Sequence, residues 1–316
     1  MTNDPAGLTA TEAVRRIRDG RLSAMELMEA CLARIAARDP VVRAFAWFDA
    51  AAARDAARAA PAGPLHGLPI GVKDVLDTAD MASGYGSPIW AGWRPRADAA
   101  AVAWARAAGA VVMGKTVTTE FATRKPGATT NPANPDHTPG GSSSGSAAGV
   151  AAGFFPLAYG TQTAGSVIRP AAYCGVVGYK LSFGTINRFG MKLMSDSLDT
   201  VGVMARSVAD CALFAGAVSG RDLGDPAMKP ADAPRIGICR SPSWHLAGAE
   251  TQGLLDRVAS ALARAGAALS ERELPAEYNA LEQAHPIVMN SESARALGWE
   301  LAHHRDGISP VLLERL

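Results

Sequence analysis

The chain is poor in the features that mark several common classes of protein. Aromatic residues make up 6% of its 316 residues, the formal net charge is +1, and basic residues nowhere form a run of five. Nucleic-acid surfaces need clustered positive charge and aromatic stacking platforms, and anionic membranes attract basic patches. We therefore expect neither a nucleic-acid partner nor a membrane partner.

Cysteine is also scarce. The four cysteines lie far apart and form no CxxC pair: Cys31, Cys174, Cys211 and Cys239. This spacing suggests neither a zinc site nor a disulfide framework. It is typical of reduced, buried thiols in a cytoplasmic protein.

Long apolar runs are missing too. The longest, residues 147–159, is interrupted by Gly149, Gly153 and Pro156 and is too short to span a bilayer. The first five residues, Met-Thr-Asn-Asp-Pro, are polar and lack the apolar centre of a signal peptide. We expect a cytoplasmic location.

What the chain does contain is an alternation of strand and helix patterns. Residues 67–74, 110–113 and 155–159 are short apolar runs typical of buried strands, while residues 98–108 and 207–218 have helical spacing. Apolar residues make up 48% of the chain, enough for a sizeable core. The pattern predicts an α/β fold with a mixed sheet covered by helices on both faces.

The N-terminal part is predicted to be helical. Capping boxes occur at residues 9–12 and 23–26, and residues 48–60 are rich in alanine and arginine. We predict an N-terminal helical cover over residues 1–62 and an α/β core over residues 63–316. Within the core, residues 234–239 and 251–265 predict a further strand and helix.

The stretch from residue 139 to residue 179 carries the chemistry. In Gly160-Thr-Gln-Thr-Ala-Gly-Ser166, a glycine-bearing turn would aim several backbone N–H groups at one point beside a serine hydroxyl. A nucleophile and an oxyanion hole are the parts that acyl transfer needs. None of the six histidines has a triad context, so a desolvated Lys73 is the candidate base. A lysine that merely reaches out from a strand end explains its position equally well.

Three ordered motifs resemble those of the amidase signature family. They are Gly67-Leu-Pro-Ile-Gly-Val-Lys-Asp74, Gly140-Gly-Ser-Ser-Ser-Gly-Ser146 and Gly160-Thr-Gln-Thr-Ala-Gly-Ser166, followed by Arg169-Pro170 and Cys174-Gly175. The resemblance implies the family fold and a catalytic set of Lys73, Ser142 and Ser166, with a cis peptide bond before Ser142. It also implies amide C–N hydrolysis through an acyl-enzyme on Ser166, with no metal and no cofactor. The oxyanion would be received by the N–H groups of Thr163, Ala164, Gly165 and Ser166.

The chain departs from the family pattern near the nucleophile. Gln162 stands where the family usually has aspartate, Ala164 where it has glycine, and Arg169 lies three residues after Ser166 instead of two. This form is similar to the malonamidase subgroup, which acts on small amides that bear a carboxylate. A guanidinium suits such a carboxylate, so we predict that Arg169 binds it; a structural ion pair is the plainer interpretation. The other candidate substrate-binding residues are Thr161, Gln162, Thr163, Ala164 and Gly165.

Several alternatives stay open. Family members usually continue well past residue 316, so we expect a chain truncated at its C-terminus with an incomplete pocket. Within the family, a tRNA-dependent amidotransferase subunit with partner subunits is possible, and a homodimer is plausible by analogy. More remote are an α/β-hydrolase using the G-x-S-x-G pattern around Ser143 and a phosphate-binding glycine loop.

Overall fold

The computed structural model describes residues 4–229 and 231–316. The chain divides into two compact units, Met1–Pro226 with Asn290–Leu316, and Ala227–Met289. This division differs from the predicted boundary at residue 62. The reason is that the N-terminal segment contributes a strand to the main sheet and packs with it in the first unit.

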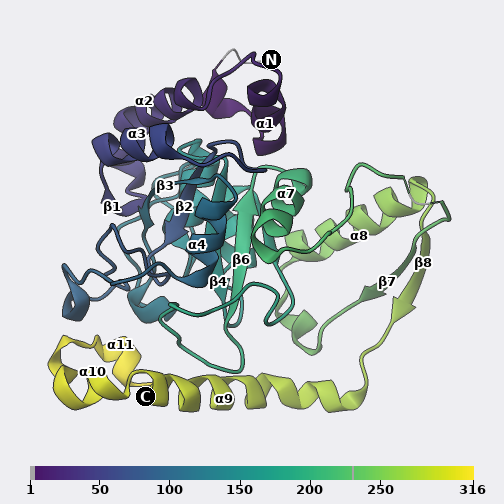
Figure 1. The fold of residues 1–316 in the computed structure, drawn as a ribbon. Helices are drawn as coiled ribbons and strands as arrows, with labels where there is room; N and C mark the ends of the chain where they lie inside the picture. Colours follow the sequence, from purple (N-terminus) through teal and green to yellow (C-terminus); the bar gives the residue numbers. More distant parts are fainter. Residues whose placement is uncertain (1–3, 230) are drawn as a thin grey trace. The chain divides into compact units, whose positions relative to one another are not determined.

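The first unit is built on a mixed sheet (Figure 1). Within the described residues this sheet has six strands in the order β1-β3-β2-β4-β6-β5. The central strands β3, β2 and β4 are parallel, whereas β1, β6 and β5 run antiparallel to their neighbours. The strands are β1 (Phe45–Phe48), β2 (Pro69–Lys73), β3 (Val111–Thr116), β4 (Leu157–Gln162), β5 (Val177–Lys180) and β6 (Thr200–Ala205).

Helices cover both faces of this sheet, as predicted. Successive residues of a strand point to opposite faces. Tyr159 packs on Phe214 of α7 and bonds to Ala101 of α4, while Gly160 faces Ser143 at the start of α5. The α-helices of the first unit are α1 (Ala10–Arg18), α2 (Ala24–Val42), α3 (Ala50–Ala59), α4 (Ala100–Ala107), α5 (Ser144–Ala152), α6 (Ile168–Cys174), α7 (Val208–Ser219), α10 (Gly298–His303) and α11 (Pro310–Leu313), with α9 (Leu281–Ala296) beginning in the other unit.

The local signals at the N-terminus are confirmed in part. Ser23 and Glu26 form both halves of the capping box of α2. At residues 9–12 only the Thr9 half forms, because the Glu12 carboxylate pairs with Arg15 and Arg16. Residues 45–48 are a strand, so the prediction of an all-helical cover is wrong there. The helix predicted from residue 48 begins at residue 50, because the Asp49 carboxylate accepts hydrogen bonds from the N–H groups of Ala51 and Ala52.

The second unit is a small β/α element. Strands β7 (Arg235–Cys239) and β8 (Ala268–Arg272) are parallel and are connected through α8 (Ala249–Arg264). The strand and helix predicted at residues 234–239 and 251–265 are therefore confirmed.

The packing behind α5 depends on residues without side chains. A Cβ on Gly149 of α5 would lie 2.2 Å from the Phe155 ring, and one on Gly71 of β2 would lie 2.5 Å from the same ring. Both contacts are shorter than side chains tolerate, so helix and strand approach this closely only through glycine. The close approach sets the start of α5 beside the end of β2.

Among the described residues, no helix is both long and apolar enough to cross a bilayer.

Candidate active site

Lys73 is the last residue of β2, and its side chain is fully buried. Its Nζ donates to Ser142 Oγ at 2.7 Å and to Thr161 Oγ1 at 2.8 Å, and it lies 3.3 Å from the Thr161 carbonyl oxygen. All three partners are neutral oxygens. The amine is thus held by hydroxyl and carbonyl groups that cannot balance a positive charge.

Burial lowers the pKa of Lys73 from its ordinary 10.5 to about 7. The negative charge of Asp199 opposes this shift and the positive charge of Arg169 adds to it. A lysine with such a pKa has a substantial neutral fraction near neutral pH. It can accept a proton there, as a general base must.

The two serine segments meet beside this lysine. The Gly141–Ser142 peptide bond is cis, as the resemblance implied. Ser142 is fully buried, and its carbonyl accepts a hydrogen bond from the Thr119 N–H at 3.2 Å. The N–H of Ser143 donates to the Ser166 carbonyl at 3.4 Å. The structure therefore brings Lys73, Ser142 and the segment bearing Ser166 together.

Gln162 holds the turn that carries Ser166. Its side-chain nitrogen donates to the Ala164 carbonyl at 2.9 Å. Its side-chain oxygen accepts from the N–H groups of Val167 at 2.8 Å and Ile168 at 3.0 Å. Both ends of the amide are engaged by backbone on either side of Ser166, so Gln162 supports the turn from within.

The backbone N–H groups of residues 163–166 have no acceptor among the described residues. Ala164 does not have a positive φ, so an alanine fits this turn without backbone strain. Ser166 is 7% exposed, Thr163 and Gly165 are half-buried and Ala164 is exposed, so this turn borders solvent. Its unpaired donors are available to an anionic oxygen.

Asp199 is a part of the site that sequence patterns did not indicate. Its carboxylate, 4% exposed, accepts a hydrogen bond from the Thr163 hydroxyl within the turn. The aspartate lies in a loop just before β6, 33 positions after Ser166, and no local pattern marks it. Only the pairing of β4 with β6 brings it to the turn.

Arg169 lies on α6 and is exposed. Its Nε and Nη2 donate to the Gly141 carbonyl at 3.0 and 2.7 Å. The guanidinium thus braces the cis peptide bond next to Ser142. Two of its N–H donors are taken up by this contact.

Ser143, the serine of the G-x-S-x-G pattern, is fully buried. Its hydroxyl lies 3.3 Å from both the N–H and the carbonyl oxygen of Thr161. These backbone contacts leave the α/β-hydrolase alternative without support. Among the described residues, no cluster of three or more histidine, cysteine, aspartate or glutamate side chains is placed to hold a metal ion.

Known proteins resemble this chain over most of its length. The family model described as Amidase matches residues 26–306. A glutamyl-tRNA(Gln) amidotransferase subunit from Roseiflexus castenholzii is 43% identical over 240 residues, which cover 72% of this chain and 49% of that protein. The chain spans about half the length of such curated relatives.

Solved structures agree with the sequence matches. The crystal structure of an amidase superposes with a TM-score of 0.88 at 31% identity, covering 98% of this chain and 73% of the other. Native peptide amidase from Stenotrophomonas maltophilia superposes with a TM-score of 0.79 at 33% identity, covering 98% and 75%. The predicted fold class is thereby confirmed.

Proposed function

The chain belongs to the amidase family, and we propose that it cleaves an amide C–N bond with Ser166 as nucleophile, Ser142 as proton relay and Lys73 as base. The observation that carries this proposal is the 2.7 Å contact between Ser142 Oγ and a fully buried Lys73 Nζ. A neutral amine at that distance can take the serine proton. The reaction follows in two halves.

In the first half, Ser166 Oγ attacks the amide carbonyl and forms the C–O bond. Its proton passes to Ser142 Oγ, whose own proton passes to Lys73 Nζ. The carbonyl oxygen becomes an oxyanion and is received by the unpaired N–H groups of residues 163–166. The C–N bond then breaks, and the proton returns through Ser142 to the leaving nitrogen, which departs as ammonia or an amine.

In the second half, water attacks the acyl group on Ser166 and the same relay takes its proton. The ester bond breaks, Ser166 recovers its proton, and a carboxylic acid leaves. The net reaction is amide plus water to acid plus amine. The chain's own residues supply every proton transfer in this scheme.

The curated relatives favour the amidotransferase alternative over a malonamidase-like enzyme. Their name describes one of the subunits of a glutamyl-tRNA(Gln) amidotransferase. We propose accordingly that this site releases ammonia from an amide donor for an acceptor held by partner subunits. The first candidate donor is the side-chain amide of glutamine.

A second candidate is hydrolysis of a small free amide that bears a carboxylate. It is favoured by Arg169, which is exposed and contacts Gly141 only through Nε and Nη2, so that Nη1 takes no part in that contact. A carboxylate could pair with that remaining nitrogen. The contact with Gly141 also gives Arg169 a role within the protein, so this candidate ranks second.

A serine-directed fluorophosphonate tests the shared chemistry. The intact protein is treated, its mass is measured, and the adduct is located by peptide mapping. We expect a single adduct on Ser166 that Lys73→Ala abolishes. An adduct on Ser143, or none on a folded chain, would contradict the proposed nucleophile.

Ammonia release then separates the two candidate substrates. Glutamine, malonamate and propanamide are compared, with and without the relatives' partner subunits, for the wild type and Arg169→Lys. Glutamine turnover that rises with partner subunits supports the amidotransferase role. Malonamate preferred over propanamide supports the second candidate, which fails if Arg169→Lys leaves that preference unchanged.

A further inference from the structure

Asp199 uses both carboxylate oxygens to join two parts of the protein. Oδ1 accepts from the Thr163 hydroxyl of the turn that bears Ser166. Oδ2 accepts from the N–H groups of Met194 at 2.7 Å and Ser195 at 3.1 Å. A carboxylate with three donors in a buried position is strongly held, because each lost bond would leave a polar group unpaired.

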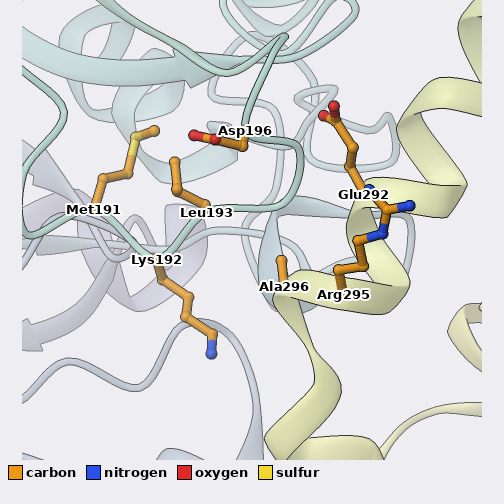
Figure 2. Close-up of a pocket in the computed structure, with 7 residues that line it drawn as sticks. All are labelled: Met191, Lys192, Leu193, Asp196, Glu292, Arg295 and Ala296. Atoms are coloured by element: carbon orange, nitrogen blue, oxygen red, sulfur yellow. The ribbon is translucent and has the colours of Figure 1, made fainter.

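The segment that holds Asp199 is itself fastened to α9. The Ser195 hydroxyl and the Ser197 N–H, the latter at 3.0 Å, both donate to Glu292. Figure 2 shows Glu292 and Arg295 extending from α9 opposite the segment that contains Met191 and Asp196. A continuous path of hydrogen bonds therefore runs from Glu292 through Ser195 and Asp199 to the turn.

The cavity in Figure 2, of about 490 Å³, does not by itself define a ligand. Asp196 pairs with Arg188. Lys192 points away from Asp196 and Glu292 and pairs with Glu300. Most charged groups of the cavity therefore have partners within the protein. The inference rests on the buried carboxylate instead.

Asp199 also acts on Lys73 through its charge. The charged groups that act on Lys73 are Asp199, which favours its protonated form, and Arg169, which disfavours it. The direct contacts of Nζ are the neutral groups of Ser142 and Thr161. Without Asp199, the buried amine would lose the negative charge that opposes its burial and the charge of Arg169, and it would become a weaker base.

We propose that Asp199 is a positioning residue of the amide-cleaving site. It fixes the Thr163–Ser166 turn through the Thr163 hydroxyl, and its negative charge keeps Lys73 basic enough to take a proton. This inference rests on the proposed function of Lys73 and Ser166. It adds a residue that touches neither the substrate nor the reacting atoms.

Two substitutions separate the two effects of Asp199. Asp199→Asn keeps the shape and removes the charge; its amide oxygen can accept from the two N–H groups while its nitrogen donates to the Thr163 hydroxyl. Thr163→Val keeps the charge and the shape of the turn residue but removes the hydroxyl. Thr163→Ser restores a hydroxyl and serves as the rescue.

The readout is the pH profile of the rate at which fluorophosphonate labels Ser166, together with ammonia release. For Asp199→Asn we expect a maximal rate about tenfold lower, because neutral hydrogen bonds hold the turn less firmly than charge-assisted ones. We also expect the midpoint of the acidic limb to move to lower pH by about one pH unit. For Thr163→Val we expect about a tenfold loss with an unmoved midpoint, and recovery in Thr163→Ser.

A second readout does not need activity. The chain has six lysines, so the ¹³Cε signal of Lys73 can be assigned by Lys73→Arg and titrated by NMR. We expect its midpoint near pH 7 in the wild type and lower in Asp199→Asn. Equal midpoints in the wild type and Asp199→Asn would overturn the charge role, and full activity of Thr163→Val would overturn the positioning role.

The failure of the proposed function would look different. In that case the wild type itself would not be labelled at Ser166, while the NMR titration would still report whether Asp199 acts on Lys73. If Asp199→Asn does not fold, Thr163→Val and its serine rescue still decide the positioning role.

Discussion

Two buried lysines on neighbouring strands have opposite surroundings. Lys73 ends β2 and Lys115 lies in β3, and both side chains are fully buried. Because Val72 is the register partner of Lys115, Lys73 and Lys115 point to opposite faces of the sheet. Lys115 Nζ lies 2.8 Å from the Asp74 carboxylate, whereas Lys73 forms no ion pair within the described part of the chain.

Burial alone therefore does not turn a lysine into a general base. A buried ammonium beside a carboxylate is part of an ion pair, whose attraction is lost when either charge is removed. A buried amine surrounded by hydroxyls gives its proton up more readily, because no carboxylate contacts it and the charge of Asp199 offsets only part of the lost hydration. The adjacent residues Lys73 and Asp74 thus belong to different kinds of site.

The largest effect is expected from removing the unpaired lysine. Lys73→Met should lower kcat/KM by about 10⁴-fold or more, because the relay loses its proton acceptor. The free energy of unfolding at pH 7 should not fall, because Lys73→Met removes a buried amine whose charged form opposes folding, and no carboxylate loses a partner. Steady-state ammonia release and urea unfolding measure the two quantities. A large loss of stability would show that Lys73 is structural, like Lys115.

Removing the paired lysine should have the reverse signature. Lys115→Met leaves Asp74 buried without a cation, so the free energy of unfolding should fall by about 3–5 kcal/mol. In Lys115→Met/Asp74→Leu, which removes both charges, much of that loss should be recovered. Urea unfolding followed by tryptophan fluorescence measures both variants. If Lys115→Met were as stable as the wild type, the distinction between the two lysines would collapse.

The pH dependence of stability should also distinguish the two sites. The folded-state pKa of Lys73, about 7, lies below its ordinary 10.5, so between these values the unfolded chain binds the extra proton. The Lys73 contribution therefore destabilises the fold below pH 7 and is progressively relieved as pH rises toward 10.5. Relative to Lys73→Met, the wild type should gain about 1.4 kcal/mol per pH unit in this window. Equal slopes of the two proteins, measured by unfolding between about pH 7 and pH 9, would contradict the lowered pKa.

Sequence patterns predicted one of these sites and not the other. The apolar run ending at Lys73 indicated a candidate base and the glycine-bearing turn a candidate nucleophile, whereas Ser142 as relay was implied only by the resemblance to the amidase signature family. Their local signals are strong because a turn with unpaired N–H groups demands glycine and small residues. Whether these residues act as assigned remains a prediction that the labelling experiment tests.

The contacts that the sequence did not reveal are those made between distant strands. Lys115 meets Asp74 across 41 positions and Asp199 meets Thr163 across 36, so both depend on strand register. The strand at residues 45–48 was hidden because Asp49 starts a helix directly after it. The contact of Arg169 with the Gly141 carbonyl was likewise hidden, because it depends on how α6 packs beside that loop.

The smallest expected effect concerns the Thr161 hydroxyl, which contacts Lys73, whereas Lys115 contacts a carboxylate. Thr161→Val keeps the shape of the side chain but removes the 2.8 Å contact with Nζ. One neutral hydrogen bond contributes about 1 kcal/mol, so kcat should fall by about fivefold with KM unchanged. Val203, the register partner of Tyr159 on the same pair of strands, offers a matched control, because Val203→Thr adds a hydroxyl away from Lys73. If Thr161→Val abolished activity as fully as Lys73→Met does, Thr161 would belong to the proton relay itself, not only to the surroundings of the base.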